Sequence, residues 1–201
     1  ERSRLMFNLF RISIFFLLIL NTTPILSSEE ENLRFLNWIN ETKNYLTNFK
    51  SVSGNFTQID NIGNISKGTF WISEKKEMAF YYSAPSETII IYREGNLFFK
   101  ERKVDNFQKY KVDNNPIFHL LDKQSNIEKY LKNGVVDSNI VKFKINLSKS
   151  SDRNTLSVIM DFPKPKLRQW KFIDQQKKET NIFFSKINYL KNISNEYFNT
   201  K

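Results

Sequence analysis

The apolar residues between positions 68 and 95 follow a pattern that predicts three consecutive β-strands. Successive side chains of a strand point to opposite faces of a sheet, and the segment 68–73 is apolar at positions of both parities. Two further apolar runs, 78–82 and 88–92, flank Pro85, which suits a connection because proline cannot donate to a strand ladder. A meander that is apolar on both faces needs cover on both, so we expect the rest of the chain to pack against it.

Period-two alternation of apolar and polar residues continues on either side of this meander. Short strands at regular spacing, joined by polar turns, are typical of a large twisted antiparallel sheet or barrel. The first strand of the meander extends back to residue 65, and the further segments in which we predict strands are 51–59, 96–100, 107–112, 140–147, 156–162, 167–173 and 180–187.

Three segments have helical spacing instead. Apolar residues recur every three or four positions over 35–49, after a capping box that Ser28 opens, so a helix is predicted over residues 29–48. Residues 116–121 form a short, very apolar segment that starts with proline, which is favoured at the first helical position. Residues 127–131 add a further helical turn.

The first 28 residues have the pattern of a secretory signal peptide. Three arginines precede the apolar run 12–20, and small and polar residues follow it up to Ser27-Ser28. This run is shorter than the roughly 20 apolar residues of an easy bilayer span, although an uncleaved N-terminal anchor stays an alternative. We therefore expect cleavage near Ser27/Ser28, export from the cytoplasm, and a single mature domain over residues 29–201.

Residue counts narrow the chemistry that the chain can perform. It has no cysteine, five glycines, and one histidine, His119. These counts argue against a disulfide framework, a Cys-ligated metal, a His-based triad and a glycine-rich phosphate loop, so no metal or cofactor is expected. The carboxylates are dispersed. Asp161 and Asp174 are the pair that neighbouring strands would bring together, which keeps an exported enzyme as a distant alternative.

The net charge of +10 bears on the partners. A basic surface is attracted to anionic lipid head groups and acidic partners. Nucleic acid is the usual partner of so basic a chain, but export from the cytoplasm argues against it. An apolar binding cavity is then the remaining candidate for a functional site.

Several motifs occur in the order that is typical of one family. After a signal peptide and a first helix, the segment FKSVSGNFTQ resembles the family's opening "l.sv.g.F.Q", and the later motifs resemble "G.l.i", "fr.eY..P", "P...LL" and "l..w.v.D". The chain thus resembles the LolA family, the periplasmic carriers of outer-membrane lipoproteins, across essentially the whole mature chain. The matching segments are 49–58, 68–72, 78–85, 116–121 and 167–174.

The resemblance implies a mainly β fold with some helix: an unclosed antiparallel β-barrel, which is a strongly curved sheet, with an N-terminal helix and short lid helices over an apolar cavity. It also implies a monomeric carrier without enzymatic activity. Such a carrier takes the acyl chains of lipoproteins from an inner-membrane LolCDE-type ABC transporter and delivers them to an outer-membrane receptor of the LolB type. LolB shares the fold but is anchored through a cysteine, which this chain lacks.

Other uses of the same fold stay open. A sensor domain that detects mislocalised lipoprotein and a carrier of glycolipid would both need the same apolar interior. The predicted lining residues rest on strand parity, which a one-residue slip reverses, and an ordinary filled β-sandwich core is the alternative. We place in the cavity lining Phe56, Phe70, Ile72, Met78, Phe80, Tyr82, Ile89 and Ile91, and on the lid Phe118, Leu120 and Leu121.

Two segments depart from the family pattern, and in one of them, Gln175-Gln176, the glycine that usually follows the family's late aspartate is missing. Where the family has Arg-Pro, with the arginine tying the barrel to its lid, this chain has Glu74-Lys75. The lid contact is therefore expected to run through another residue, with Lys75 and Lys76 as the candidates.

Overall fold

The computed structural model describes residues 24–48, 51–112, 115–121, 126–147 and 154–200. The chain divides into two compact units, Glu1–Asn37 and Trp38–Lys201. The predicted signal peptide lies almost entirely outside the described residues, so its cleavage stays a prediction. No helix in the described part of the chain is long and apolar enough to be a membrane span.

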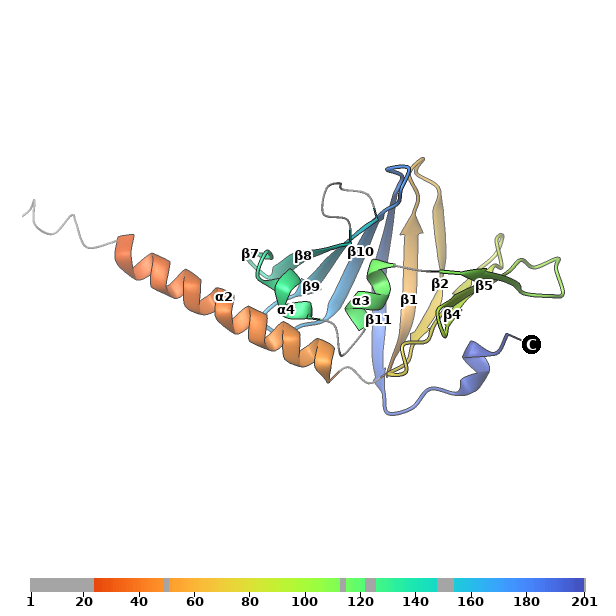
Figure 1. Ribbon diagram of the computed structural model, residues 1–201, viewed down its shortest axis with the longest axis horizontal. Helices are drawn as coiled ribbons and strands as arrows, with labels where there is room; N and C mark the ends of the chain where they lie inside the picture. Colours follow the sequence, from red (N-terminus) through yellow and green to blue (C-terminus); the bar gives the residue numbers. More distant parts are fainter. Residues whose placement is uncertain (1–23, 49–50, 113–114, 122–125, 148–153, 201) are drawn as a thin grey trace, which may run out of the picture. The chain divides into compact units, whose positions relative to one another are not determined.

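Eleven strands form one antiparallel sheet in the second unit (Figure 1). Their order is β6-β5-β4-β3-β2-β1-β11-β10-β9-β8-β7, so consecutive strands are neighbours except β6 and β7, and β1 also pairs with β11. Because β6 and β7 stand at the two ends of this order, the sheet is not closed, which confirms the predicted fold class. The strands are β1 (Ser51–Ile59), β2 (Ile65–Ile72), β3 (Met78–Tyr82), β4 (Ile89–Arg93), β5 (Asn96–Lys100), β6 (Gln108–Lys111), β7 (Val135–Asp137), β8 (Ile140–Asn146), β9 (Thr155–Asp161), β10 (Leu167–Ile173) and β11 (Glu179–Leu190).

Aspartate side chains stabilise two neighbouring turns at one end of the sheet. The carboxylate of Asp60 accepts hydrogen bonds from the backbone N–H groups of Ile62 and Asn64, each at 2.9 Å. Asp174 does the same between β10 and β11, where it accepts from the N–H groups of Gln176 and Lys178. An aspartate that bonds its own turn holds the two strands in register.

The cross-strand register defines two faces of the sheet. Directly paired residues of an antiparallel sheet point the same way. Phe56 of β1 pairs with Phe184 of β11, so the two side chains share a face. Ile182, two positions before Phe184, lies on the same face and pairs with Trp170 of β10, which in turn pairs with Val158 of β9. We call this the inner face. The opposite side, which we call the outer face, carries residues such as those in the odd positions of β3 and β4.

The C-terminal segment covers part of the outer face. Ala79 and Ile91, paired across β3 and β4, are both fully buried and cluster with Phe198 of the short 3₁₀ helix η2 (Asn195–Phe198). Trp71 stacks on Tyr197 with ring centroids 4.2 Å apart. The meander is thus apolar on both faces because a different element packs on each, although the sequence pattern did not predict η2.

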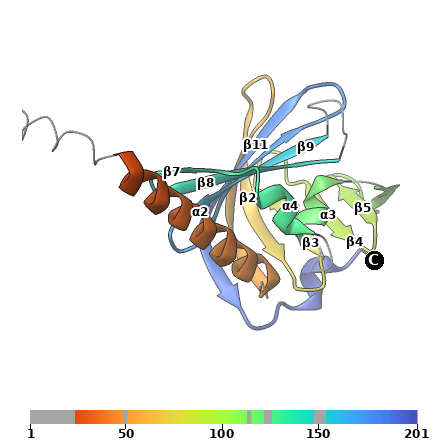
Figure 2. The ribbon, with the colours of Figure 1, turned by 60° about the vertical axis from the view of Figure 1, so that its left-hand side comes forward.

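Three α-helices complete the described structure: α2 (Pro24–Thr47), α3 (Pro116–Leu121) and α4 (Ile127–Leu131). The short helix α3 packs on β8 and β9, and α4 packs on β8 (Figures 1 and 2). Helix α2 begins before the predicted capping box, so Ser28 lies within the helix rather than at its start. Proline at the first helical position accounts for the earlier start.

Candidate functional site

Six aromatic side chains of the inner face form a continuous band. Neighbouring rings have centroids between 4.9 and 6.1 Å apart, and most pairs meet edge to face, the geometry that aromatic pairs favour. In order of contact, the aromatic band consists of Trp170, Phe184, Phe70, Phe80, Phe56 and Tyr82.

Two glycines make room for the central rings of the band. Gly54 pairs with Phe70 and Gly68 pairs with Phe56, across β1 and β2. A ring can lie over its glycine partner because no Cβ occupies that space. The two pairs are reciprocal, so each strand contributes one ring and one glycine.

The band is buried at its Trp170 end and through its middle. Trp170, Phe56 and Phe70 are each at most 1% exposed, whereas Phe80 and Tyr82 are half-buried. Three pockets of 470, 450 and 510 Å³ lie between described residues elsewhere, and no member of the band lines them. The buried rings of the band are thus packed within the protein, whereas Phe80 and Tyr82 are partly accessible.

The structure brings six of the eight predicted lining residues together. Phe56, Phe70, Ile72, Met78, Phe80 and Tyr82 all lie on the inner face. Their role in binding a ligand stays a prediction.

Ile89 and Ile91 lie on the outer face, which corrects their predicted placement. Ile91 pairs with Ala79 and Ile89 with Tyr81, so both point toward η2 and not toward the band. The run 89–92 is apolar at both parities, so its pattern does not say which face it presents. The inner positions of β4 belong to Ile90, opposite Phe80, and to Tyr92, opposite Met78.

Helix α3, the predicted lid, contacts this inner position of β4. The ring of Phe118 stacks on Tyr92 with centroids 3.6 Å apart and an interplanar angle of 16°. Leu120 is buried. The third predicted lid residue, Leu121, ends the helix, and its side chain lies outside the described residues.

The Trp38–Thr47 part of α2 also covers the inner face. Trp38 is fully buried against Gly134, which precedes β7 and has no room for a Cβ beside the indole. Lys43 forms an ion pair with Glu128 of α4 at 3.0 Å. The hydroxyl oxygens of Tyr45 and Tyr189 lie 3.2 Å apart, and burial raises the pKa of Tyr45. This part of the helix therefore reaches from the start of β7 to β11.

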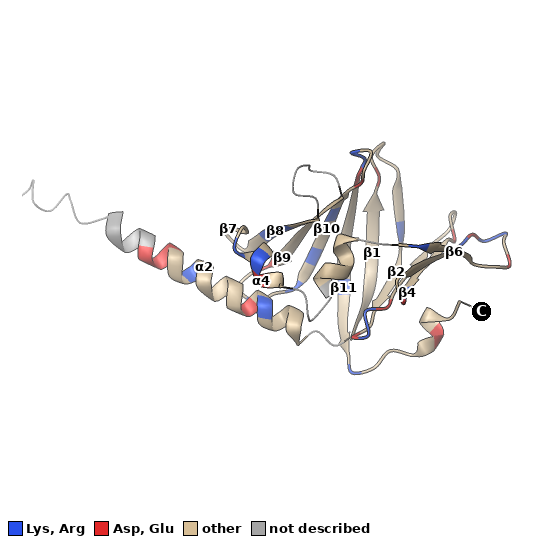
Figure 3. Cartoon of the chain, viewed as in Figure 1, with Lys and Arg blue, Asp and Glu red and all other residues tan. Residues whose placement is uncertain are grey.

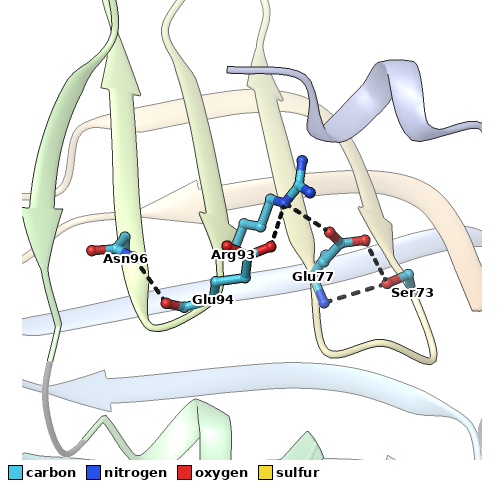
Figure 4. Close-up of polar contacts among 5 residues, drawn as sticks. All are labelled: Ser73, Glu77, Arg93, Glu94 and Asn96. Carbon is cyan, nitrogen blue, oxygen red and sulfur yellow. Dashed lines mark hydrogen bonds and ion pairs between the residues drawn. The ribbon is translucent and has the colours of Figure 1, made fainter. Parts of the chain in front are cut away.

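Arg93 contacts the turn that contains Glu74-Lys75 (Figure 4). Arg93 of β4 lies 3.3 Å from a carboxylate oxygen of Glu77, and the other oxygen of Glu77 accepts from Ser73 at 3.4 Å. Arg93 also contacts Glu94, so it joins the β2–β3 turn to the β4–β5 turn. The contacts described here link two hairpins of the sheet. They do not establish the lid contact predicted for Lys75 or Lys76, which stays a prediction.

The carboxylates of the predicted alternative site do not meet. Thr155 pairs with Ile173, next to Asp174, whereas Asp161 lies at the other end of β9 and forms an ion pair with Arg168 at 3.3 Å. Within the described residues, no group of three or more His, Cys, Asp or Glu side chains is placed to hold a metal ion.

Basic side chains are distributed over several strands, turns and helices (Figure 3). The carboxylate of Glu128 is an example of local compensation, because hydrogen bonds from Lys43 and Lys132 lower its pKa. Along the described chain, basic and acidic residues are thus interspersed (Figure 3).

Residues 47–201 match the family described as "Outer membrane lipoprotein carrier protein LolA". The chain belongs to the LolA family. The matched range contains all eleven described strands, the short α-helices α3 and α4, and the whole aromatic band. The comparison with curated protein sequences found no match.

Solved structures similar to this LolA-family chain have little sequence in common with it. An uncharacterized conserved protein from Thermus thermophilus has 6% identity and a TM-score of 0.49, with 79% of this chain and 90% of that chain covered. A LolA superfamily protein from Nitrosomonas europaea has 7% identity and a TM-score of 0.44, covering 82% and 96%. The Mycobacterium tuberculosis lipoprotein LppX has 11% identity and a TM-score of 0.46, covering 80% and 98%. With TM-scores below 0.5, these likenesses say nothing about function.

Sequence reasoning missed the Trp170 end of the site. It predicted strands over 167–173 and 180–187 but assigned no lining residue there. Trp170 and Phe172 are two positions apart in one predicted strand, and Ile182 and Phe184 are two positions apart in the next. Because such positions share a face of the sheet, this spacing was the available signal.

Proposed function

We propose that this protein is a periplasmic carrier that binds the acyl chains of lipoproteins released from the inner membrane and delivers them to the outer membrane. Membership of the LolA family is the observation that carries the proposal. The inner face supports it, because it presents a band of aromatic rings that helical elements cover.

The free-energy cost of moving a lipid out of a bilayer is large. Burial of one methylene group is worth about 0.8 kcal/mol, so a lipid with two or three long acyl chains needs on the order of tens of kcal/mol to leave a bilayer uncovered. An apolar container offsets this cost during transit through water. The chain has no glycine-rich phosphate loop, so we assign the energy of extraction to a partner, an inner-membrane ABC transporter of the LolCDE type.

The packed state of the band gives the carrier a way to release its cargo. When the lipid leaves, α3 and the Trp38–Thr47 part of α2 return to the inner face, and Phe118 stacks on Tyr92. Closing these contacts restores the apolar burial that the acyl chains supplied, which keeps the affinity for cargo moderate. We propose that an outer-membrane acceptor of the LolB type then receives the lipid.

A release assay tests this function. Inner-membrane vesicles that contain the transporter and a tagged lipoprotein are incubated with ATP and the purified mature protein, and the soluble fraction is assayed for a complex of the two. The proposal predicts ATP-dependent release into a one-to-one complex, and transfer from that complex to outer-membrane vesicles. Lipoprotein that stays in the membrane fraction at every protein concentration would contradict it.

A further inference from the structure

Among the residues that the structure describes, two buried groups near the inner face lack a hydrogen-bond partner. The indole Nε1 of Trp170 and the hydroxyl of Thr42 have no hydrogen-bond partner within the part of the chain that the structure describes. Trp170 is 1% exposed and Thr42 is 0% exposed, so bulk water does not reach either of them. Buried polar groups are almost always satisfied, and an orphaned pair is a feature that a ligand can complete.

The two groups come from elements that face each other. Trp170 lies on the inner face of β10, at the end of the aromatic band. On α2, Trp38 lies against Gly134 before β7, and Tyr45 reaches Tyr189 on β11. Thr42 comes four residues after Trp38 and three before Tyr45, so it lies on the same side of the helix as these two residues. This side faces the strands between β7 and β11. Strand β10 is one of those strands.

The chemistry of the pair restricts the ligand group. An indole N–H can only donate, so its partner must carry an acceptor, and the threonine hydroxyl can donate to a second lone pair. A hydrocarbon chain offers no acceptor. The carbonyl oxygen of an acyl ester or amide offers two lone pairs and is attached directly to the hydrocarbon that the phenylalanine rings would bury.

The opposite end of the band is different. The hydroxyl of Tyr82 donates to Oε1 of Gln58 at 2.7 Å, so that end is already satisfied within the protein. Of the two residues that end the band, Trp170 and Tyr82, Trp170 is therefore the one whose donor is unsatisfied. An amphipathic ligand that lies along the band can bind its polar group there.

We propose that Trp170 and Thr42 bind the carbonyl of an acyl ester or amide, and so fix the polar end of the lipid while its chain lies along the aromatic band. This inference rests on the proposed lipid-carrier function. It assigns specificity to two residues: the site distinguishes acylated lipids from lipids whose chains have the same length but no carbonyl.

The test compares two probes with the mature protein, dipalmitoylglycerol and its diether analogue dihexadecylglycerol, by displacement of a fluorescent fatty acid. The ester carries carbonyl groups and the ether has none. We expect Trp170→Phe to weaken binding of the ester about 3- to 10-fold, the range for one hydrogen bond, and to change binding of the ether less than about twofold. Thr42→Val, which keeps the side-chain shape, should show the same selective loss.

Trp71→Phe is the matched control. Trp71 is on the outer face, stacked on Tyr197, so its replacement should change neither affinity. Circular dichroism confirms the fold of each variant, and if Trp170→Phe does not fold, Thr42→Val decides the question. Equal loss for both probes, or no loss for either, overturns the inference while the binding itself upholds a lipid carrier. Wild-type protein that binds neither probe contradicts the proposed function instead.

Discussion

The ring of Phe56 lies over Gly68, its partner across β1 and β2, so closely that a Cβ on the glycine would stand 2.7 Å from Cε1 of the ring. The same Cβ would also collide with the carbonyl oxygen of Tyr81. Gly68 is therefore required by the packing of the inner face, and its contact with Phe56 lets the aromatic band cross the middle of the sheet.

This contact predicts that Gly68→Ala destabilises the protein. Neither a backbone carbonyl nor a buried ring can move away cheaply, so we expect the free energy of unfolding to fall by about 1–3 kcal/mol, the usual cost of overpacking. Urea denaturation followed by tryptophan fluorescence measures the change. Thr69→Ala, at the exposed neighbouring position, is the control and should cost much less. Equal stability of Gly68→Ala and the wild type would show that the ring is free to move.

The inner and outer faces should respond differently to the same charge. Phe80→Glu puts a carboxylate in the half-buried part of the aromatic band, where an acyl chain cannot solvate it. We expect the affinity for a fluorescent fatty acid to fall about tenfold or more. Phe183→Glu is the control, because Phe183 of strand β11 is 39% exposed on the outer face. Wild-type affinity of Phe80→Glu would argue against a lipid site on the inner face.

The outer cluster should matter for stability and not for lipid. Phe198 of η2 is 2% exposed and covers Ala79 and Ile91. We expect Phe198→Ala to lower the free energy of unfolding by about 3–5 kcal/mol, as large core truncations do, and to leave probe affinity unchanged. Val135→Ala, at a position 62% exposed, should change stability by less than about 0.5 kcal/mol. If Phe198→Ala abolished binding in a folded protein, Ile91 and its neighbours would belong to the ligand site after all.

The half-buried side chain of Tyr82 predicts a loss of stability at high pH. Burial raises the pKa of Tyr82 to about 12, above its ordinary value of about 10 in the unfolded chain. Above pH 10 the unfolded state releases this proton while the folded state keeps it, so stability falls as the pH rises toward 12 and is fully present below 10. Tyr82→Phe should therefore lose less stability than the wild type between pH 10 and 12 in urea titrations. Parallel slopes for the two proteins would contradict the assignment, and Tyr110→Phe, at an exposed tyrosine, serves as the control.

Strand alternation predicted most of the sheet because each half-buried strand repeats its burial every two residues. The six residues from Phe56 to Tyr82 that are predicted to line a cavity do share one face, because short turns join β1, β2 and β3 and carry the alternation from strand to strand. The pattern does not assign a face to residues 89–91, because three consecutive isoleucines are compatible with either face of the sheet. The three-residue strand β7 was too short to show alternation.

The long-range features of the site could not be predicted from local pattern. The pairing of β1 with β11 brings Phe56 beside Phe184, and no local signal links residues so far apart in the chain. The cover that η2 gives to the outer face has the same origin. The contact between Phe118 and Tyr92 also depends on tertiary packing, although the sequence predicts the apolar helix that carries Phe118.

The most direct test of the central claim is native mass spectrometry of the protein purified without detergent. We predict a fraction of the protein in a one-to-one complex whose added mass is that of a triacylated lipoprotein, and loss of that complex in Phe80→Glu but not in Phe183→Glu. Free glycolipid as the bound species, or protein that carries no lipid under any condition of expression, would contradict a lipoprotein carrier.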